Sequence, residues 1–311
     1  MKNVRTVFMG SPEFARTTLQ ALIGVVNLVG VVTQPDRPAG RGKVLTAPPV
    51  KLLAAAAGIP IMQPERLRRP EAFDQLAAWQ PELIVVAAFG QILRQNVLDL
   101  PKFGCINVHA SLLPRWRGAA PIQAALLHGD LQTGVTIMKM DAGIDTGDML
   151  ARRVVDINEQ DNTASLTGRL ATAGAELLLA TLPPYLEGKI QPMPQDHDQA
   201  TYAPMIKKEN GLLDFSERAE VLVCKVRAYN PWPGTFFQWE GQPLKVLKAS
   251  SQVETGLKPA QRGTVNGLPA VGTADGALIL VEVQPAGKKT MPGAVFLNGA
   301  RRWLDNGTGV G

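Results

Sequence analysis

Short apolar runs alternate with segments of helical spacing along the first half of the chain. Residues 4–9 form an apolar run that ends in a Gly-Ser-Pro turn, and apolar positions then recur with a helical period over 13–23. Further apolar runs follow at 28–33 and 83–88. The second of these is apolar at every position, which is expected of a strand whose sheet is covered on both faces.

The same alternation continues into the middle of the chain. Strands are predicted at 104–109, 135–140 and 149–155. A helix is expected over 121–127, because proline is favoured at the first helical position. Residues 163–187 predict a long amphipathic helix that Pro183 and Pro184 interrupt near its end. Alternating strands and helices indicate an α/β domain, residues 1–189, with a doubly wound, largely parallel, Rossmann-like sheet.

Beyond residue 189 the pattern becomes rich in proline and then in short strands. Residues 190–207 have little apolar periodicity and are predicted to be a linker. A helix is expected near 217–228. After it, strand patterns separated by Gly and Pro occur at 235–239, 244–249, 263–265, 270–273 and 277–284. Short strands of this kind indicate a small β-barrel over 208–311, although an open sandwich would give a similar pattern.

The composition is that of an ordinary globular protein, with 311 residues, 45% hydrophobic and 19% charged. A net charge of +5 fits an anionic partner without identifying one. The N-terminus lacks a signal-peptide core, and the most apolar region, 21–33, is too short to cross a bilayer. Cys105 and Cys224 have neither disulfide nor metal-site spacing. We therefore expect a cytoplasmic protein with no membrane partner and no metal.

The turn after the first strand bears on cofactor use. A dinucleotide-binding turn needs the pattern Gly-x-Gly-x-x-Gly, whose glycines let the backbone approach a pyrophosphate. Here only the first position, Gly10, is a glycine. A nicotinamide-dependent oxidoreductase is therefore a disfavoured alternative.

The strongest chemical signal is an Asn-x-His motif formed by Asn107 and His109 at the end of a predicted strand. Alternate residues of a strand point to the same face, and open α/β sheets bind ligands at the carboxyl ends of their strands. An amide that donates a hydrogen bond, beside an imidazole that exchanges protons near neutral pH, suits attack on a carbonyl. The pair predicts acyl transfer, although an isolated Asn-x-His is more often a satisfied structural pair.

Two loops could complete such a site. In the loop 141–148, one of Asp141, Asp145 and Asp148 could approach His109 and fix its tautomer, but the spacing does not choose among them. A second loop carries four basic residues against one acid between positions 34 and 51. Its Gly and Arg content is compatible with a nucleic-acid phosphate backbone as well as with a solvated surface loop.

With these motifs in place, the chain resembles the folate-dependent formyltransferases from its first strand to near its C-terminus. The matching segments are 10–15, 33–43, 104–123, 134–138, 145–148, 230–233 and 284–289. The Asn-x-His, Ser-Leu-Leu-Pro and Asp set is shared by formyltransferases with different acceptors. The QPDRPAGRGK and NPWP segments are more specific to the members that act on tRNA. The departures are slight: Ser11 where Thr is common, and Ala110 where Gly is common.

The resemblance implies formyl transfer from 10-formyltetrahydrofolate to the α-amino group of methionyl initiator tRNA, for translation initiation. By analogy, Asn107, His109 and Asp145 are catalytic. The positions implied for folate binding are Ser111, Leu112, Leu113 and Pro114, and those for tRNA binding are Arg37, Arg41 and Lys43. The resemblance also implies an OB-like C-terminal domain that contacts tRNA. The absence of an obvious apolar interface stripe suggests a monomer.

Two further alternatives stay open at this point. One is a formyltransferase for another amine, such as an amino sugar nucleotide, which would not require the Arg41 loop. The other is a tRNA-binding protein without activity, against which the intact Asn107, His109 and Asp145 argue.

Overall fold

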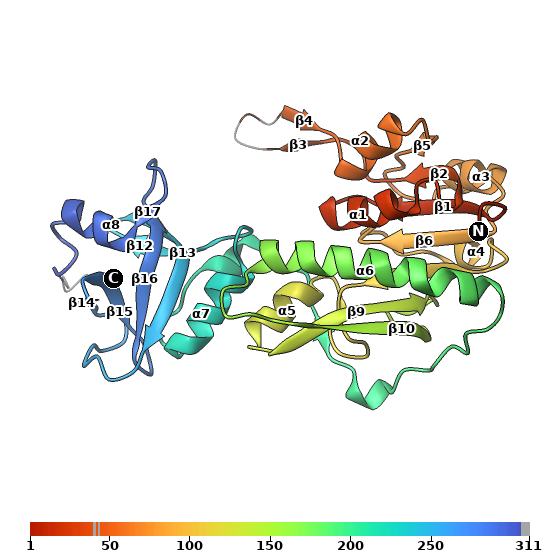
Figure 1. Ribbon diagram of the computed structural model, residues 1–311. Helices are drawn as coiled ribbons and strands as arrows, with labels where there is room; N and C mark the ends of the chain where they lie inside the picture. The colour runs from red at the N-terminus through yellow and green to blue at the C-terminus, as the bar shows by residue number, and fades with distance from the viewer. Residues whose placement is uncertain (40–41, 43, 306–311) are drawn as a thin grey trace. The chain divides into compact units, whose positions relative to one another are not determined.

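The structure of the protein is a computed structural model that describes residues 1–39, 42 and 44–305 (Figure 1). The chain divides into two compact units. The first unit comprises Met1–Pro121, Gln132–Asp156 and Thr167–Pro204, and the second comprises Ile122–Leu131, Ile157–Leu166 and Met205–Gly311. The division differs from the predicted boundary at residue 189, because two short segments before that residue belong to the second unit and the first unit extends to Pro204.

A seven-stranded sheet forms the centre of the first unit, in the order β10-β9-β7-β6-β1-β2-β5. Its strands are β1 (Arg5–Gly10), β2 (Asn27–Val32), β5 (Ile61–Met62), β6 (Leu83–Ala87), β7 (Cys105–His109), β9 (Gln132–Lys139) and β10 (Met149–Asp156). In the order of the sheet, neighbouring strands pair in parallel from β5 through β2, β1 and β6 to β7. Strand β9 is antiparallel to both β7 and β10. This arrangement confirms the predicted doubly wound, largely parallel sheet.

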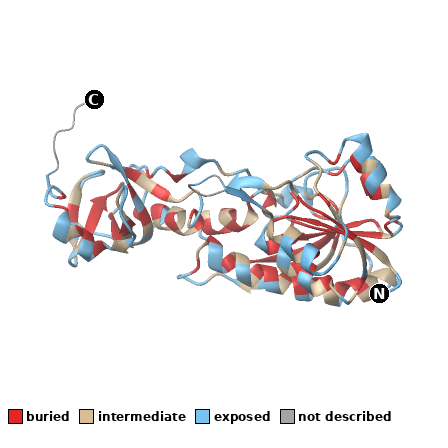
Figure 2. Cartoon of the chain, turned by 90° about the horizontal axis from the view of Figure 1, so that it is seen from above, coloured by how far each residue is buried: buried red, intermediate tan, exposed pale blue. Residues whose placement is uncertain are grey.

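The order of the strands reverses beside β1. The chain moves outward from β1 to β2 and β5, then returns to place β6 and β7 on the other side of β1. Every residue of β6 is buried, as its continuous apolar run predicted. In Figure 2 the strands of this sheet are buried and the helices beside them expose their outer faces. The carboxyl ends of β1, β6 and β7 therefore meet at the edge where such sheets bind ligands.

Among the described residues, six helices lie between residues 13 and 186, of which three match those predicted over 13–23, 121–127 and 163–187, and the other three were not predicted. They are α1 (Glu13–Leu22), α2 (Pro49–Ala56), α3 (Pro70–Ala78), α4 (Gln95–Leu98), α5 (Pro121–Leu127) and α6 (Thr163–Leu186). The predicted interruption at Pro183 and Pro184 is wrong, since both lie inside α6. Leu178 and Leu182 are fully buried, and the Tyr185 hydroxyl donates to the Phe103 carbonyl at 2.7 Å. This packing and anchoring hold the last turn although the prolines lack two amide donors.

The segment predicted as a linker, 190–207, is structured over much of its length. Met193 exchanges two backbone hydrogen bonds with Met149, and His197–Gln199 forms one 3₁₀ turn. Strand β11 (Tyr202–Ala203) pairs in parallel with β8 (Arg117–Gly118). The chain as far as Pro204 thus belongs to the first unit. Backbone pairing over long sequence separations fixes this segment, and its proline-rich composition did not indicate that.

The second unit contains the predicted domain of short β-strands, and these strands pair antiparallel. Six strands pair in the order β12-β13-β16-β15-β14, with β17 on β16. They are β12 (Thr235–Trp239), β13 (Gln242–Gln252), β14 (Arg262–Val265), β15 (Leu268–Gly272), β16 (Ala277–Gln284) and β17 (Met291–Pro292). Helices α7 (Ala219–Ala228) and α8 (Gly293–Gly299) contribute Leu222 and Phe296 to its core, where Trp303 is 1% exposed.

Candidate active site

Asn107 and His109 lie on β7, at the carboxyl end of this central strand. Their side chains are 8% and 6% exposed. Strand β7 is paired on one side with β6 and on the other with β9, so both residues are held by hydrogen-bonded neighbours. The predicted placement of an amide and an imidazole at a strand end is therefore confirmed.

The loop between β9 and β10 brings one aspartate to this pair. The Asp145 Oδ1 atom accepts a hydrogen bond from Asn107 Nδ2 at 3.3 Å and lies 3.5 Å from His109 Nδ1. Its other oxygen, Oδ2, accepts from the backbone N–H of Gly118 at 2.9 Å. One carboxylate thus connects both residues of the Asn-x-His motif to strand β8.

The other two aspartates of this loop have different surroundings. Asp141 is exposed, and its Oδ1 accepts from Gly143 N at 3.1 Å and from Thr146 Oγ1 at 2.6 Å. Asp148 accepts a backbone bond from Lys139 N at 2.8 Å through its carbonyl. Asp145 is therefore the aspartate that the structure places against His109, a choice that spacing alone left open.

The backbone of the following turn fixes the tautomer of His109. Its Nε2 atom lies 2.9 Å from the Trp116 carbonyl oxygen. Because a carbonyl only accepts hydrogen bonds, Nε2 carries a proton in this arrangement. The proton that the ring gains or loses is then the one on Nδ1, the atom that faces Asp145.

The four residues predicted to bind folate form the turn that presents this carbonyl. Ser111 is fully buried, and its Oγ donates to the Arg115 carbonyl at 2.6 Å. Leu113 is also fully buried, in a cluster with Met138 and Met149. Leu112 and Pro114 are half-buried. The Ser111 and Leu113 side chains thus support the turn from inside, and folate contact by this segment stays a prediction.

Two residues that sequence reasoning did not single out lie beside Asp145. Arg117 is 1% exposed, and its Nε and Nη2 donate to Gln195 Oε1 at 3.0 and 2.8 Å. Gln195 Nε2 in turn donates to the carbonyls of Asp145 and Gly147 at 2.9 and 2.7 Å. Arg117 belongs to the motif-rich stretch 104–123, but no spacing signal distinguishes Gln195 in a predicted linker.

The neighbouring strand ends are also tied together. A Cβ atom at Gly10 would lie 2.5 Å from the Ala87 carbonyl oxygen, so the end of β1 requires glycine for this close approach to β6. Ser11 Oγ accepts from Gln34 N at 3.0 Å, and Gln34 Nε2 donates to the Phe89 carbonyl at 3.2 Å. These hydrogen bonds connect the loops that follow β1, β2 and β6 at the carboxyl edge of the sheet.

The basic loop between positions 34 and 51 contains two short strands, β3 (Arg37–Ala39) and β4 (Val44–Thr46), which pair antiparallel as a hairpin. Arg37 is exposed, whereas Arg41 and Lys43 lie outside the described residues. At the base of the hairpin, Asp36 accepts hydrogen bonds from Lys51 Nζ and Gln63 Nε2, each at 2.7 Å. Hydrogen bonds from the Gln63 amide and the Lys51 ammonium group lower the pKa of Asp36.

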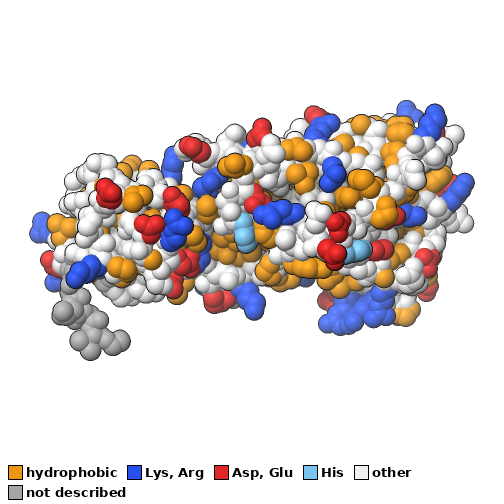
Figure 3. All heavy atoms as spheres, turned by 90° about the horizontal axis from the view of Figure 1, so that it is seen from below, with side chains coloured by type: hydrophobic (Ala, Val, Ile, Leu, Met, Phe, Trp, Pro, Cys, Tyr) orange, Lys and Arg blue, Asp and Glu red, His pale blue; other side chains and the backbone are white. Residues whose placement is uncertain are grey.

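Charge is mixed on the face shown in Figure 3, where Lys and Arg side chains lie in separate groups among acidic ones and form no continuous basic surface. In the part of the chain that the structure describes, no three His, Cys, Asp or Glu side chains are grouped so that they could hold a metal ion. No helix among the described residues is both long and apolar enough to cross a membrane.

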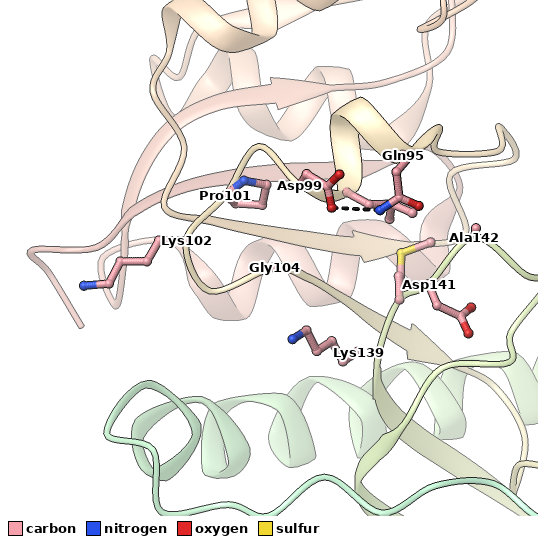
Figure 4. Close-up of a pocket in the computed structure, with 10 residues that line it drawn as sticks. Gln95, Asp99, Pro101, Lys102, Gly104, Lys139, Asp141 and Ala142 are labelled. Atoms are coloured by element: carbon pink, nitrogen blue, oxygen red, sulfur yellow. Dashed lines mark hydrogen bonds between the residues drawn. The ribbon is translucent and has the colours of Figure 1, made fainter.

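A cavity of about 330 Å³ lies near the opposite end of β7 (Figure 4). Its lining includes Asp99, Lys102, Gly104, Lys139 and Asp141. Gly104 directly precedes β7, whereas His109 is the last residue of that strand. The cavity is therefore separate from the Asn107–His109–Asp145 site.

Comparison with protein families gives two matches. Residues 4–182 match the family model described as "Formyl transferase", and residues 205–301 match "Formyl transferase, C-terminal domain". Together the two models cover most of the chain.

Curated relatives are similar over nearly their whole length. A protein of Bacillus pumilus named "Methionyl-tRNA formyltransferase" is 50% identical over 305 residues, which is 95% of each chain. A protein of the same name from Geobacter sulfurreducens is 45% identical, over 100% of this chain and 98% of its own.

Solved structures share the fold at low identity. An N-formyltransferase from Helicobacter canadensis, in complex with folinic acid and dTDP-3-aminofucose, superposes with a TM-score of 0.66 at 16% identity. The match covers 91% of this chain and 99% of that one.

Proposed function

The chain belongs to the formyl transferase family, and we propose that it transfers the formyl group of 10-formyltetrahydrofolate to the α-amino group of methionyl initiator tRNA. The identity of 45–50% to relatives that carry this activity in their name supports the acceptor. The observation that carries the chemistry is the Asp145 carboxylate, which lies within 3.5 Å of both the Asn107 amide and the His109 imidazole.

The proposed reaction is direct attack of the amine on the formyl carbon. The carbonyl oxygen becomes an oxyanion in the tetrahedral intermediate, and Asn107 Nδ2 donates a hydrogen bond to it. His109 keeps its Nε2 proton on the Trp116 carbonyl and exchanges a proton through Nδ1. Asp145 holds the ring and stabilises its charged form. The attacking amine gives up a proton to His109 Nδ1, and the folate nitrogen receives a proton from the same atom as collapse of the intermediate breaks its bond to the formyl carbon. The formyl group is left on the methionyl amine.

The binding residues follow from the resemblance. We assign the segment from Ser111 to Pro114 to folate and Arg37, Arg41 and Lys43 to tRNA. The exposure of Arg37 on a hairpin that Asp36 anchors supports this assignment. The second unit, expected to be an OB-like barrel, adds further tRNA contact. We further propose that the protein is a monomer located in the cytoplasm.

The experiment that tests the function is an assay of the purified protein with 10-formyltetrahydrofolate and methionyl initiator tRNA. We expect N-formyl-methionyl-tRNA to accumulate with enzyme concentration. An amino sugar nucleotide replaces the tRNA in a parallel reaction. Formylation of the sugar alone would refute the acceptor but keep the chemistry, and no formylation of either would refute both.

The Arg41→Ala variant tests the tRNA assignment separately. Loss of a phosphate contact is expected to weaken tRNA binding and to reduce its salt dependence by about one unit of the log–log slope. Folate binding in the same variant serves as the control and should not change. An unaltered rate at limiting tRNA would contradict the role of this loop.

A further inference from the structure

Asp145 has a backbone conformation that needs support from its surroundings. Its φ angle is +52°, in the left-handed region that residues other than glycine rarely adopt. The next glycine, Gly147, is packed so closely that a Cβ atom there would overlap with the Lys139 carbonyl. The direction of the Asp145 carboxylate thus depends on a tight and locally unfavourable loop.

A single amide holds the carbonyl groups of this loop. Both hydrogens of Gln195 Nε2 are used, one on the Asp145 carbonyl at 2.9 Å and one on the Gly147 carbonyl at 2.7 Å. Gln195 is 5% exposed, so water does not replace these bonds easily. The amide therefore fixes the backbone on both sides of Thr146.

Arg117 fixes the orientation of that amide. Gln195 Oε1 accepts from Arg117 Nε and Nη2 at 3.0 and 2.8 Å. A guanidinium group only donates and the two carbonyls only accept, so the amide oxygen and nitrogen cannot exchange places without losing all four bonds. Arg117 Nη2 also lies 3.1 Å from His197 Nδ1.

Strand β8 holds Asp145 from two sides. The Gly118 N–H binds the Asp145 carboxylate directly, and the side chain of the preceding residue, Arg117, holds the Asp145 carbonyl through Gln195. The pairing of β8 with β11 fixes this strand, and a Cβ at Gly118 would lie 2.7 Å from the Ala203 carbonyl oxygen.

We propose that Gln195, oriented by Arg117, is a positioning residue that holds the Asp145 carboxylate against His109 and Asn107 for formyl transfer. It acts through Asp145 and touches neither substrate. This proposal rests on the proposed function, because Gln195 and Arg117 matter for catalysis only if Asp145 takes part in formyl transfer.

The decisive variant is Gln195→Glu. A carboxylate at this position keeps the acceptor for Arg117, but it presents an acceptor instead of a donor to the Asp145 and Gly147 carbonyls, so both bonds that support the loop are lost. We expect kcat to fall about 10- to 100-fold, because a small displacement of a catalytic group has effects of this size. The KM values for tRNA and folate should stay within about threefold, since no substrate contact is removed.

Controls separate positioning from general structural damage. Gln199→Met alters a glutamine of the same segment, whose Nε2 donates to the exposed Asp196 carboxylate at 2.7 Å, and it should leave kcat unchanged. In an Asp145→Asn background, Gln195→Glu should cost less than about twofold, because its effect passes through the missing carboxylate. An equal loss of kcat in both backgrounds, or a normal kcat in Gln195→Glu, would overturn the proposal.

Hydrogen–deuterium exchange gives a readout that does not depend on activity. Gln195→Glu should increase exchange of the amides of residues 141–148, and Gln199→Met should not. Unchanged exchange in this loop would refute the positioning role even if the wild-type protein formylated nothing. A wild type that is inactive on methionyl-tRNA while the loop loses protection would refute only the proposed function.

Discussion

Replacing Asp145 with asparagine removes one charge while keeping the shape of the side chain. The amide oxygen can still accept the hydrogen bond from the Gly118 N–H, and this bond keeps the loop in its position. What is lost is the attraction between the carboxylate and the charged form of His109, together with the hydrogen bond that Asp145 Oδ1 accepts from Asn107 Nδ2, because the amide NH2 group cannot accept it. The variant therefore tests the carboxylate while keeping the size and shape of the side chain.

The magnitude follows from the distance between the two groups. Unit charges 3.5 Å apart, the separation of His109 Nδ1 and Asp145 Oδ1, attract by about 1 kcal/mol at a dielectric constant of ~80 and by about 5 kcal/mol at ~20. The side chains are 6% and 15% exposed, which favours the larger figure. Desolvation offsets part of this attraction, so we expect kcat to fall roughly 10²- to 10³-fold.

The assay is a steady-state measurement of kcat for formyl transfer with saturating folate and tRNA, together with the thermal melting midpoint of each variant. Asp141→Asn is the matched control, because it alters an exposed carboxylate of the same loop whose acceptor role an amide can keep. A folded Asp145→Asn enzyme with near-normal kcat would refute the reasoning. So would an equal loss of rate in Asp141→Asn.

Three further predictions concern stability and reactivity. Leu113→Ala empties a fully buried position beside Met138 and Met149 and should lower the free energy of unfolding in urea by about 2–5 kcal/mol; a loss below ~1 kcal/mol would contradict the packing. Burial raises the pKa of the Cys105 thiol to about 12, so a disulfide reagent at about pH 8 should label this residue only after unfolding. Because Gln63 and Lys51 hold the pKa of Asp36 below its usual 3.8, their contribution to stability is present above that pH and is lost as the pH falls through the lowered value. The free energies of unfolding of Asp36→Asn and wild type should therefore differ by a constant amount above about pH 5 and converge in acid. A difference that grows in acid would contradict this prediction.

Much of the first unit could be predicted because its strands are buried on both faces and its helices carry clear signals. The run at 83–88 and the proline that begins α5 lead to elements whose bounds the structure reproduces closely. The Asn-x-His pair was predictable for the same reason, since period-two alternation at a strand end fixes the face of both side chains.

The parts that could not be predicted depend on contacts between distant residues. The choice of Asp145 among three aspartates is made by the Gly118 N–H and by a positive φ angle, neither of which spacing encodes. Gln195 looked like a linker residue because its four hydrogen bonds go to residues that are 48–78 positions away. The two prolines inside α6 depart from the local rule that proline ends a helix, because packing of the last turn outweighs that preference.

The central claim is that Asn107, His109 and Asp145 carry out formyl transfer, and the His109→Ala variant tests it most directly. The measurement is the rate of N-formyl-methionyl-tRNA formation in a single turnover, starting from enzyme saturated with 10-formyltetrahydrofolate. Loss of the proton-exchanging group predicts a rate lower by roughly 10²- to 10⁴-fold with folate binding intact. A near-normal rate in a variant that still binds folate would contradict the account.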